Sequence, residues 1–139
     1  MRTAAADADI VGFSDFRHVG RGEGVELSHF GPEGLADRVA VVKTAAGDRL
    51  TDLELSVLVQ WANVTDDPEG SIRTRFGELV GDGPLDPALL ESPFLLVGTA
   101  REITAAIHER RERFGVSYFR FLEDAADAVA PIVADLSGK

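Results

Sequence analysis

Residues 53–63 read LELSVLVQWAN, and this stretch decides the fold class. Every second residue from Leu53 to Trp61 is apolar, whereas the alternate positions from Glu54 to Ala62 mix charged, polar and apolar side chains. This alternation predicts a β-strand with one apolar face and one mixed face. In a barrel the apolar face would pack against outer helices, and the mixed face would point into the interior.

The flanking sequence predicts helices that alternate with two further strands. Pro32 is typical of a first helical turn and Gly47 of a helix end, while Thr99 and Glu102 form a capping box for a helix that ends at Gly115. Residues 85–97 could hold a short helix at 87–91, followed by either a buried extended segment or the approach to the next helix, and we favour a helical insert over a sheet strand. By residue range we expect the end of a helix at 3–7, a strand at 9–13, a long loop at 14–31, and helices at 32–47, 68–80, 87–91 and 99–115; a third strand follows at 116–122 and a last helix at 124–136.

This order predicts a single α/β domain over residues 1–139. Long helical connections separate the expected strands, so neighbouring strands should be parallel. Parallel strands are normally covered on both faces, and a sheet of so few strands leaves two open edges. We therefore expect an unfinished sheet, the back half of something larger.

Composition excludes several classes of function. The chain has 139 residues, a net charge of -10 and no cysteine, which disfavours a nucleic-acid partner and excludes disulfides, zinc ribbons and iron–sulfur clusters. No apolar run reaches the roughly 18 residues of a membrane span, and the N-terminus lacks the apolar core of a signal peptide. These features predict a cytoplasmic protein with no membrane partner.

Several segments together resemble one family. They are ADIVGF at 8–13, GPEGLADRVAVVKTAAGDR at 31–49, LELSVLV at 53–59, ESPFLLVGTAREI at 91–103 and APIVADL at 130–136. In order and spacing they resemble the last three strand–helix units of the luciferase-like monooxygenases, particularly the oxidoreductases that depend on the deazaflavin coenzyme F420. The resemblance covers nearly the whole chain and is weakest at residues 14–26.

The resemblance implies a fold and an activity. It implies part of a (β/α)8 TIM barrel, about half of one at most, since a complete barrel needs about 250 residues. It also implies hydride transfer between reduced F420, or alternatively FMN, and a small organic substrate. In that family the earlier strands and a glycine-rich segment hold most of the cofactor, and nothing in this sequence matches those parts. No family catalytic or cofactor-binding residue is therefore assigned to a position here, and the chain alone could be a truncated, inactive form.

A barrel fold would nonetheless indicate which end of the strands carries the functional residues. Active sites of such barrels lie at the C-terminal ends of the strands. By position alone, the candidates for this functional face are Ser14, Asp15, Arg17, His18, Trp61, Asn63 and Glu123. Trp61 is more often a core residue in such a pattern, and the spacing of His18 and His29 fits no zinc site.

Two groups of charged residues invite specific expectations. Glu54 and Arg120 both lie mid-strand in otherwise apolar surroundings, and if their strands are neighbours they could form a buried pair inside the barrel. Arg110, Arg111 and Arg113 alternate with acidic residues on the helix at 99–115, which predicts a solvated, salt-bridged helix face.

Two other functions remain open. The chain could be a non-catalytic module whose unfinished sheet self-associates, giving a homo-oligomer, or docks on a complementing chain. It could also be an unrelated small α/β binding domain, which would be a stable monomer with closed sheet edges.

Overall fold

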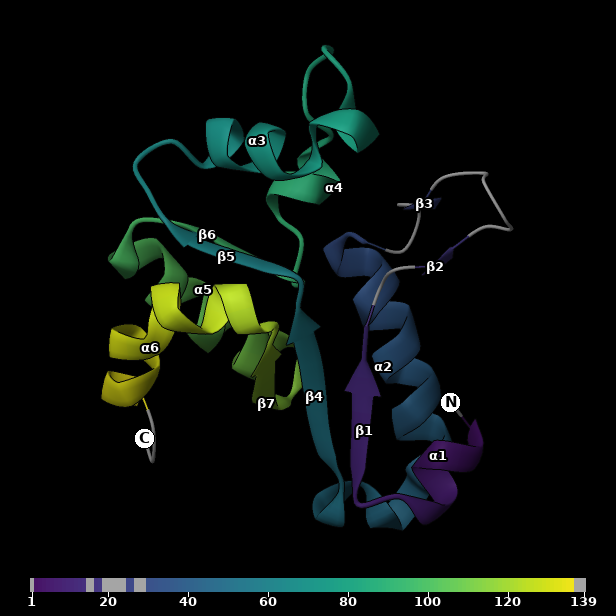
Figure 1. The fold of residues 1–139 in the computed structure, drawn as a ribbon. Helices are drawn as coiled ribbons and strands as arrows, with labels where there is room; N and C mark the ends of the chain where they lie inside the picture. Colours follow the sequence, from purple (N-terminus) through teal and green to yellow (C-terminus); the bar gives the residue numbers. More distant parts are fainter. Residues whose placement is uncertain (1, 15–16, 19–24, 27–29, 137–139) are drawn as a thin grey trace.

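The computed structural model describes residues 2–14, 17–18, 25–26 and 30–136. Helices and strands alternate along most of the chain, as the sequence predicts (Figure 1). The elements are α1 (Arg2–Asp7), β1 (Ile10–Phe13), β2 (Arg17–His18), β3 (Val25–Glu26), α2 (Pro32–Ala46), the 3-10 helix η1 (Gly47–Asp52), β4 (Glu54–Val59), β5 (Trp61–Val64), α3 (Pro68–Val80), α4 (Pro87–Leu90), β6 (Leu95–Gly98), α5 (Ala100–Phe114), β7 (Val116–Phe121) and α6 (Glu123–Leu136).

The main sheet has three strands in the order β1-β4-β7, and both pairs of neighbours are parallel. Strands that are consecutive in the expected alternation are thus neighbours in space, which confirms an α/β fold. The described residues form this sheet and two small two-stranded sheets, β2-β3 and β5-β6, and they do not close a barrel. In Figure 1 both small sheets lie beyond the C-terminal ends of β1 and β4.

The stretch 53–63 is two strands and not the single strand expected. β4 ends at Val59, the chain bends at Gln60, and β5 then pairs in parallel with β6. The backbone N–H of Gln60 donates to the carbonyl oxygen of Phe94 at 2.8 Å, and this bond anchors the bend. The helical insert favoured at residues 85–97 is present as the short helix α4, but the preference against a sheet strand is wrong, because Leu95–Gly98 forms β6. A short apolar run cannot distinguish a buried strand from a helix segment by its pattern.

Local signals set the helix boundaries as expected. Gly47 caps α2 with a positive φ of 54°, and Gly115 caps α5 in the left-handed conformation with a φ of 73°. The capping box of Thr99 and Glu102 is present at the start of α5. Pro131 lies inside α6, which runs as one helix from Glu123 to Leu136.

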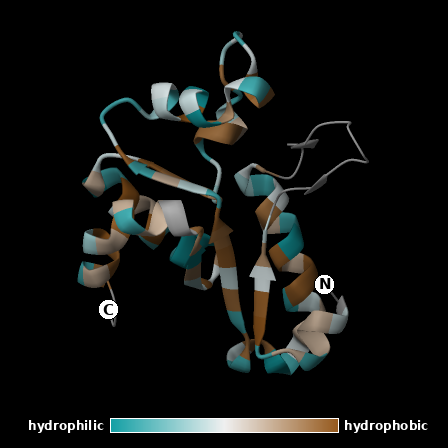
Figure 2. Ribbon diagram, viewed as in Figure 1, coloured by the Kyte–Doolittle hydropathy of each residue, from teal (hydrophilic) through white to brown (hydrophobic). Residues whose placement is uncertain are grey.

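Two hydrophobic clusters lie against the helix-covered face of the sheet. In the first, alternate residues of β1 and β4, such as Val11 and Leu55, pack with Leu35 and Val39 of α2. The second joins Val59, at the end of β4, to residues of β5, β6, α5 and α6. Figure 2 shows the hydrophobic residues concentrated along β1 and β4. The residues of β1, β4 and β7 that belong to these clusters all lie on one face of the main sheet.

No helix in the described part of the chain is long and apolar enough to cross a membrane.

Candidate functional site

The residues expected on the functional face follow the C-terminal ends of the strands. Ser14 comes directly after β1, Trp61 and Asn63 lie on β5 just beyond the end of β4, and Glu123 begins α6 after β7. The backbone of Arg17 and His18 forms β2, which Figure 1 places beyond the same end of the sheet. Asp15 lies outside the described residues, as do the side chains of Arg17, His18 and Glu123.

The structure brings together Trp61 and Asn63 and adds two residues from α3. Asn63 Nδ2 donates to Ser71 Oγ at 2.9 Å, and Trp61 Nε1 donates to the same oxygen at 3.2 Å. The guanidinium carbon of Arg75 lies 5.1 Å from the centre of the Trp61 ring, within the range of a cation–π contact. Trp61 is half-buried and packs against the first hydrophobic cluster. We call Trp61, Asn63, Ser71 and Arg75 the indole cluster.

The indole cluster follows from two periodicities. Trp61 and Asn63 are two positions apart on β5 and share one face of the strand, while Ser71 and Arg75 are four apart and share one face of α3. Ser71 and Arg75 were not among the residues expected on the functional face, because their spacing alone gives no signal of a site. Only the fold of α3 over β5 makes them neighbours of Trp61.

The chemistry of the indole cluster suits binding. An indole, an amide, a hydroxyl and a guanidinium supply an aromatic surface and hydrogen-bond donors, but none is a general base at neutral pH. Such groups stack on planar polar molecules and form hydrogen bonds with them, and here Trp61 Nε1 and Asn63 Nδ2 already donate to Ser71 Oγ. The indole cluster offers no group that would accept a proton in a reaction.

Ser14 stands apart from the indole cluster and contacts α2 instead. Its carbonyl oxygen accepts a hydrogen bond from Arg38 Nη1 at 3.1 Å. The guanidinium carbon of Arg38 also lies 5.2 Å from the centre of the Phe94 ring. These contacts tie the end of β1 to α2 and to the segment before β6.

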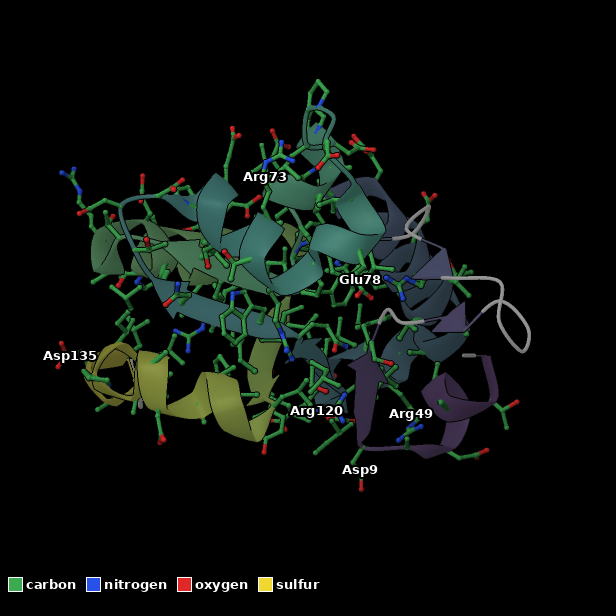
Figure 3. The ribbon with its side chains drawn as sticks, turned by 45° about the horizontal axis from the view of Figure 1, so that its top comes forward. Asp9, Arg49, Arg73, Glu78, Arg120 and Asp135 are labelled. Atoms are coloured by element: carbon green, nitrogen blue, oxygen red, sulfur yellow. The ribbon has the colours of Figure 1, made fainter. Side chains whose placement is uncertain are left out.

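The expected buried pair between Glu54 and Arg120 is wrong. Both side chains are exposed, on the face of the main sheet opposite the hydrophobic clusters. Arg120 is the register partner of Leu58, two positions beyond Ser56 on β4, and its guanidinium reaches across to β1 and lies over Gly12 (Figure 3). The pairing was expected from a barrel interior that the described strands do not enclose.

The expectation for the basic residues of α5 is correct at one of its positions and wrong at another. Arg113 pairs with Glu109 one turn earlier at 3.3 Å, and both side chains are about half exposed. Arg110 is only 5% exposed, and its Nη2 donates to the carbonyl oxygens of Ser92 at 3.0 Å and Leu95 at 2.5 Å. Arg110 lies on the buried face of α5 with Ile103, Ile107 and Phe114, so its position on the helix, and not the surrounding charges, decides its environment.

Arg110 also lines a groove between α3, β6 and α5. The groove has a volume of about 560 Å³, an apolar floor that includes Ile72 and Ile103, and carboxylates such as Glu69 and Glu91 along its lining. Arg110 Nη1 is buried and has no hydrogen-bond partner in the described structure. Because carboxylates outnumber guanidiniums in the lining, the groove does not favour a small anion.

No group of three or more potential metal-binding side chains occurs among the residues whose side chains are described.

Comparison of the chain with models of protein families, with curated proteins and with solved structures gave no match.

Proposed function

We propose that this chain is the C-terminal segment of a luciferase-like oxidoreductase that uses coenzyme F420 or, alternatively, FMN. In this proposal its three parallel strands are the last three of a (β/α)8 barrel, and other strands complete the barrel. The family assignment comes from the sequence resemblance. One structural observation supports it: the helices cover one face of a parallel sheet whose strands follow chain order.

That observation separates a barrel from the other common parallel architecture. A doubly wound sheet has helices on both faces, and its strand order reverses at a switch point. Here the order β1-β4-β7 shows no reversal, and the hydrophobic clusters lie on one face only. A barrel wall has this form, because its helices surround the outside and its inner face meets other strands.

The cofactor fits the present residues only in part. The indole cluster offers Trp61 for stacking and Asn63 for hydrogen bonding, at the end of the strands where barrel active sites lie. A deazaflavin also has an anionic tail, which calls for concentrated positive charge, whereas this chain has a net charge of -10. The cofactor would supply the hydride chemistry, and we assign no reaction step to this chain alone.

A fluorescence titration tests the proposal. The purified chain, shown to be folded by circular dichroism, is titrated with F420 and separately with FMN. We expect saturable binding at micromolar concentration. Asn63→Ala should weaken it at least about fivefold, because the variant lacks the side-chain amide that can donate and accept hydrogen bonds. Thr44→Ala, an exposed substitution on α2, is the matched control and should leave binding unchanged.

A folded chain that binds neither cofactor would contradict a usable pocket in this segment. Equal binding by the Asn63→Ala and parent chains would instead exclude the indole cluster as the site.

The bare sheet face favours a second candidate, a non-catalytic module that associates through that face. The third alternative, an unrelated monomer with closed edges, is disfavoured because β1 and β7 each pair with a strand on one side only in the main sheet.

A further inference from the structure

The face of the main sheet opposite the helices, which we call the open face, exposes large apolar side chains. Ile10 on β1 is 49% exposed and Tyr118 on β7 is 50% exposed, the highest values among the exposed large hydrophobic residues of the described structure. Glu54 and Ser56 lie on the open face of β4, since they alternate with the core residue Leu55. Ile10 is the register partner of Glu54 and Tyr118 that of Ser56, so both side chains lie on the open face as well. Parallel sheets are almost always covered on both faces, so an uncovered one is a candidate interface.

Arg120 lies at the centre of the open face. Gly12 has no Cβ, and the guanidinium of Arg120 occupies the space where one would stand. A Cβ placed on Gly12 would lie 3.3 Å from Ser56 Oγ. Gly12, Ser56 and Arg120 therefore form one cluster across the three strands. Ser56 is 1% exposed and its Oγ has no hydrogen-bond partner in the described structure. The guanidinium therefore lies over the middle of the sheet, while the Arg120 residue as a whole stays exposed.

The charges of the open face complement each other. Glu54 lies on the same face of β4, two positions before Ser56, toward the N-terminal end of the strand. The face thus presents a carboxylate at one end and a guanidinium nearer its centre, with apolar groups on either side. A two-fold axis that lies in the plane of the interface, runs across the strands and passes between the levels of Glu54 and Ser56 would bring the guanidinium of Arg120 of each copy onto Glu54 of the other.

We propose that the open face is a self-complementary interface and that its occupant is a second copy of this chain. Packing covers Ile10 and Tyr118, and each guanidinium gains a carboxylate from the other copy. A face that carried charges of only one sign would repel a second copy of itself. This face carries both signs, so Arg120 of each copy can pair with Glu54 of the other. The proposal concerns the chain by itself, without the other strands that would cover this face in a completed barrel, and it does not depend on cofactor binding.

The size of the face predicts a weak dimer. Strands about 4.8 Å apart and about 20 Å long present roughly 300 Å² of sheet. Stable complexes bury about 800 Å² on each partner. We therefore expect a concentration-dependent dimer with a dissociation constant on the order of 10 to 100 μM.

Sedimentation velocity over a range of about 2 to 500 μM protein tests the interface. Moderate salt is needed, because each copy has a net charge of -10 and the Debye length falls to about 8 Å at physiological ionic strength. The single charge reversals Arg120→Glu and Glu54→Arg should each weaken dimerisation at least about tenfold, and the double variant should restore it to within about threefold.

Matched control variants exist on α5. Arg101 and Glu112 are exposed there, and Arg101→Glu and Glu112→Arg change the net charge by the same amounts as the interface variants. These controls should leave the dissociation constant within about twofold of the parent chain. Circular dichroism establishes that each variant is folded.

An apolar pair of variants probes the same face independently. Tyr118→Ser should abolish measurable dimerisation, whereas Val41→Ser on α2, where the side chain is 41% exposed, should not. A folded chain that stays monomeric throughout the concentration range would overturn the proposal. So would a dimer that tolerates both the single charge reversals and Tyr118→Ser, since another surface would then form it. Cofactor titration is a separate measurement, so failure of either proposal leaves the other testable.

Discussion

Arg110 shows how a single residue joins elements that are distant in the sequence. Its hydrogen bonds to the carbonyl oxygens of Ser92 and Leu95 tie α5 to the segment that leads into β6. Ser92 in turn donates through its Oγ to the carbonyl oxygen of Phe30 at 2.7 Å. Three separate stretches of chain thus meet through side-chain to backbone bonds, which satisfy carbonyl groups that would otherwise be buried without partners.

We expect Arg110→Met to lower the free energy of unfolding by about 1 to 3 kcal/mol, because it leaves the Ser92 and Leu95 carbonyls without a charged donor. Arg101→Met, exposed on the same helix, is the control and should change stability by less than about 0.5 kcal/mol. Urea denaturation measures both.

The difference in the free energy of unfolding between the parent chain and Arg110→Met should not depend on pH near neutrality. Burial lowers the pKa of Arg110 to about 10, and Glu109 opposes that shift. Because the folded pKa lies below the unfolded value, the cost of burying the charge is fully present below about pH 10 and is relieved only above it. A difference between Arg110→Met and the parent chain that varies by more than about 1 kcal/mol from about pH 5 to about pH 9 would contradict this assignment.

At the scale of elements, the start of α5 is the best-determined boundary. Thr99 Oγ1 accepts from the backbone N–H of Glu102 at 3.3 Å, while the Glu102 carboxylate accepts from the backbone N–H and the hydroxyl of Thr99, each at 2.8 Å. These bonds satisfy amide groups that a helix terminus leaves without intrahelical partners. They also lower the pKa of Glu102, first through the backbone bond and then through the hydroxyl.

The lowered pKa predicts a pH-dependent contribution of Glu102 to stability. The carboxylate stabilises the folded chain above its unfolded pKa, near 4.5, and this contribution is lost as pH falls through the folded value. The stability difference between the parent chain and Glu102→Gln should thus be present at pH 7 and vanish in acid. Thermal unfolding across this pH range measures it, with Glu112→Gln, exposed on the same helix, as the control. A difference that persists unchanged in acid would exclude the carboxylate as its source.

Elements differ in how far the sequence predicts them. Helices α2 and α5 match expectation because proline, glycine and a capping box act within one turn of their ends. The buried positions Leu35, Val39 and Val42 follow from helical spacing alone. The bend at Gln60 was not predicted, because its cause is a hydrogen bond to Phe94, a residue far along the chain.

At the scale of the whole molecule, the open face has consequences for stability as well as association. Glu54 and Arg120 are exposed on it, so neither is a buried charge that needs a partner. We expect Glu54→Gln and Arg120→Met each to change the free energy of unfolding by less than about 0.5 kcal/mol at low protein concentration. Loss of the Arg120 side chain would also open Ser56 Oγ to water, which supplies the missing hydrogen-bond partner.

Denaturation at a concentration of about 2 μM, where the proposed dimer would be dissociated, measures these changes. Arg110→Met is the internal comparison, since the same substitution at a buried arginine should be costly. A loss of about 3 to 5 kcal/mol at Glu54 or Arg120 would instead indicate a buried pair.

Two residues of the indole cluster could be predicted from the local sequence pattern, and the other two depend on the fold. Trp61 and Asn63 could be chosen from the sequence because they follow an apolar strand, and the C-terminal ends of parallel strands meet at one edge. Ser71 and Arg75 could not, because nothing on α3 indicates that it lies over β5. The pairing of β5 with β6 decides this, and those strands are separated by two helices.

The sequence by itself determined the α/β class, the parallel pairing of β1, β4 and β7 and most helix boundaries, because periodicity, connection length and capping act over a few residues. Tertiary structure decided the division of residues 53–63 into two strands, the carbonyl groups to which Arg110 donates and the exposure of Glu54 and Arg120. These outcomes depend on which distant backbone groups and surfaces meet, and on a sheet face that the described chain leaves uncovered.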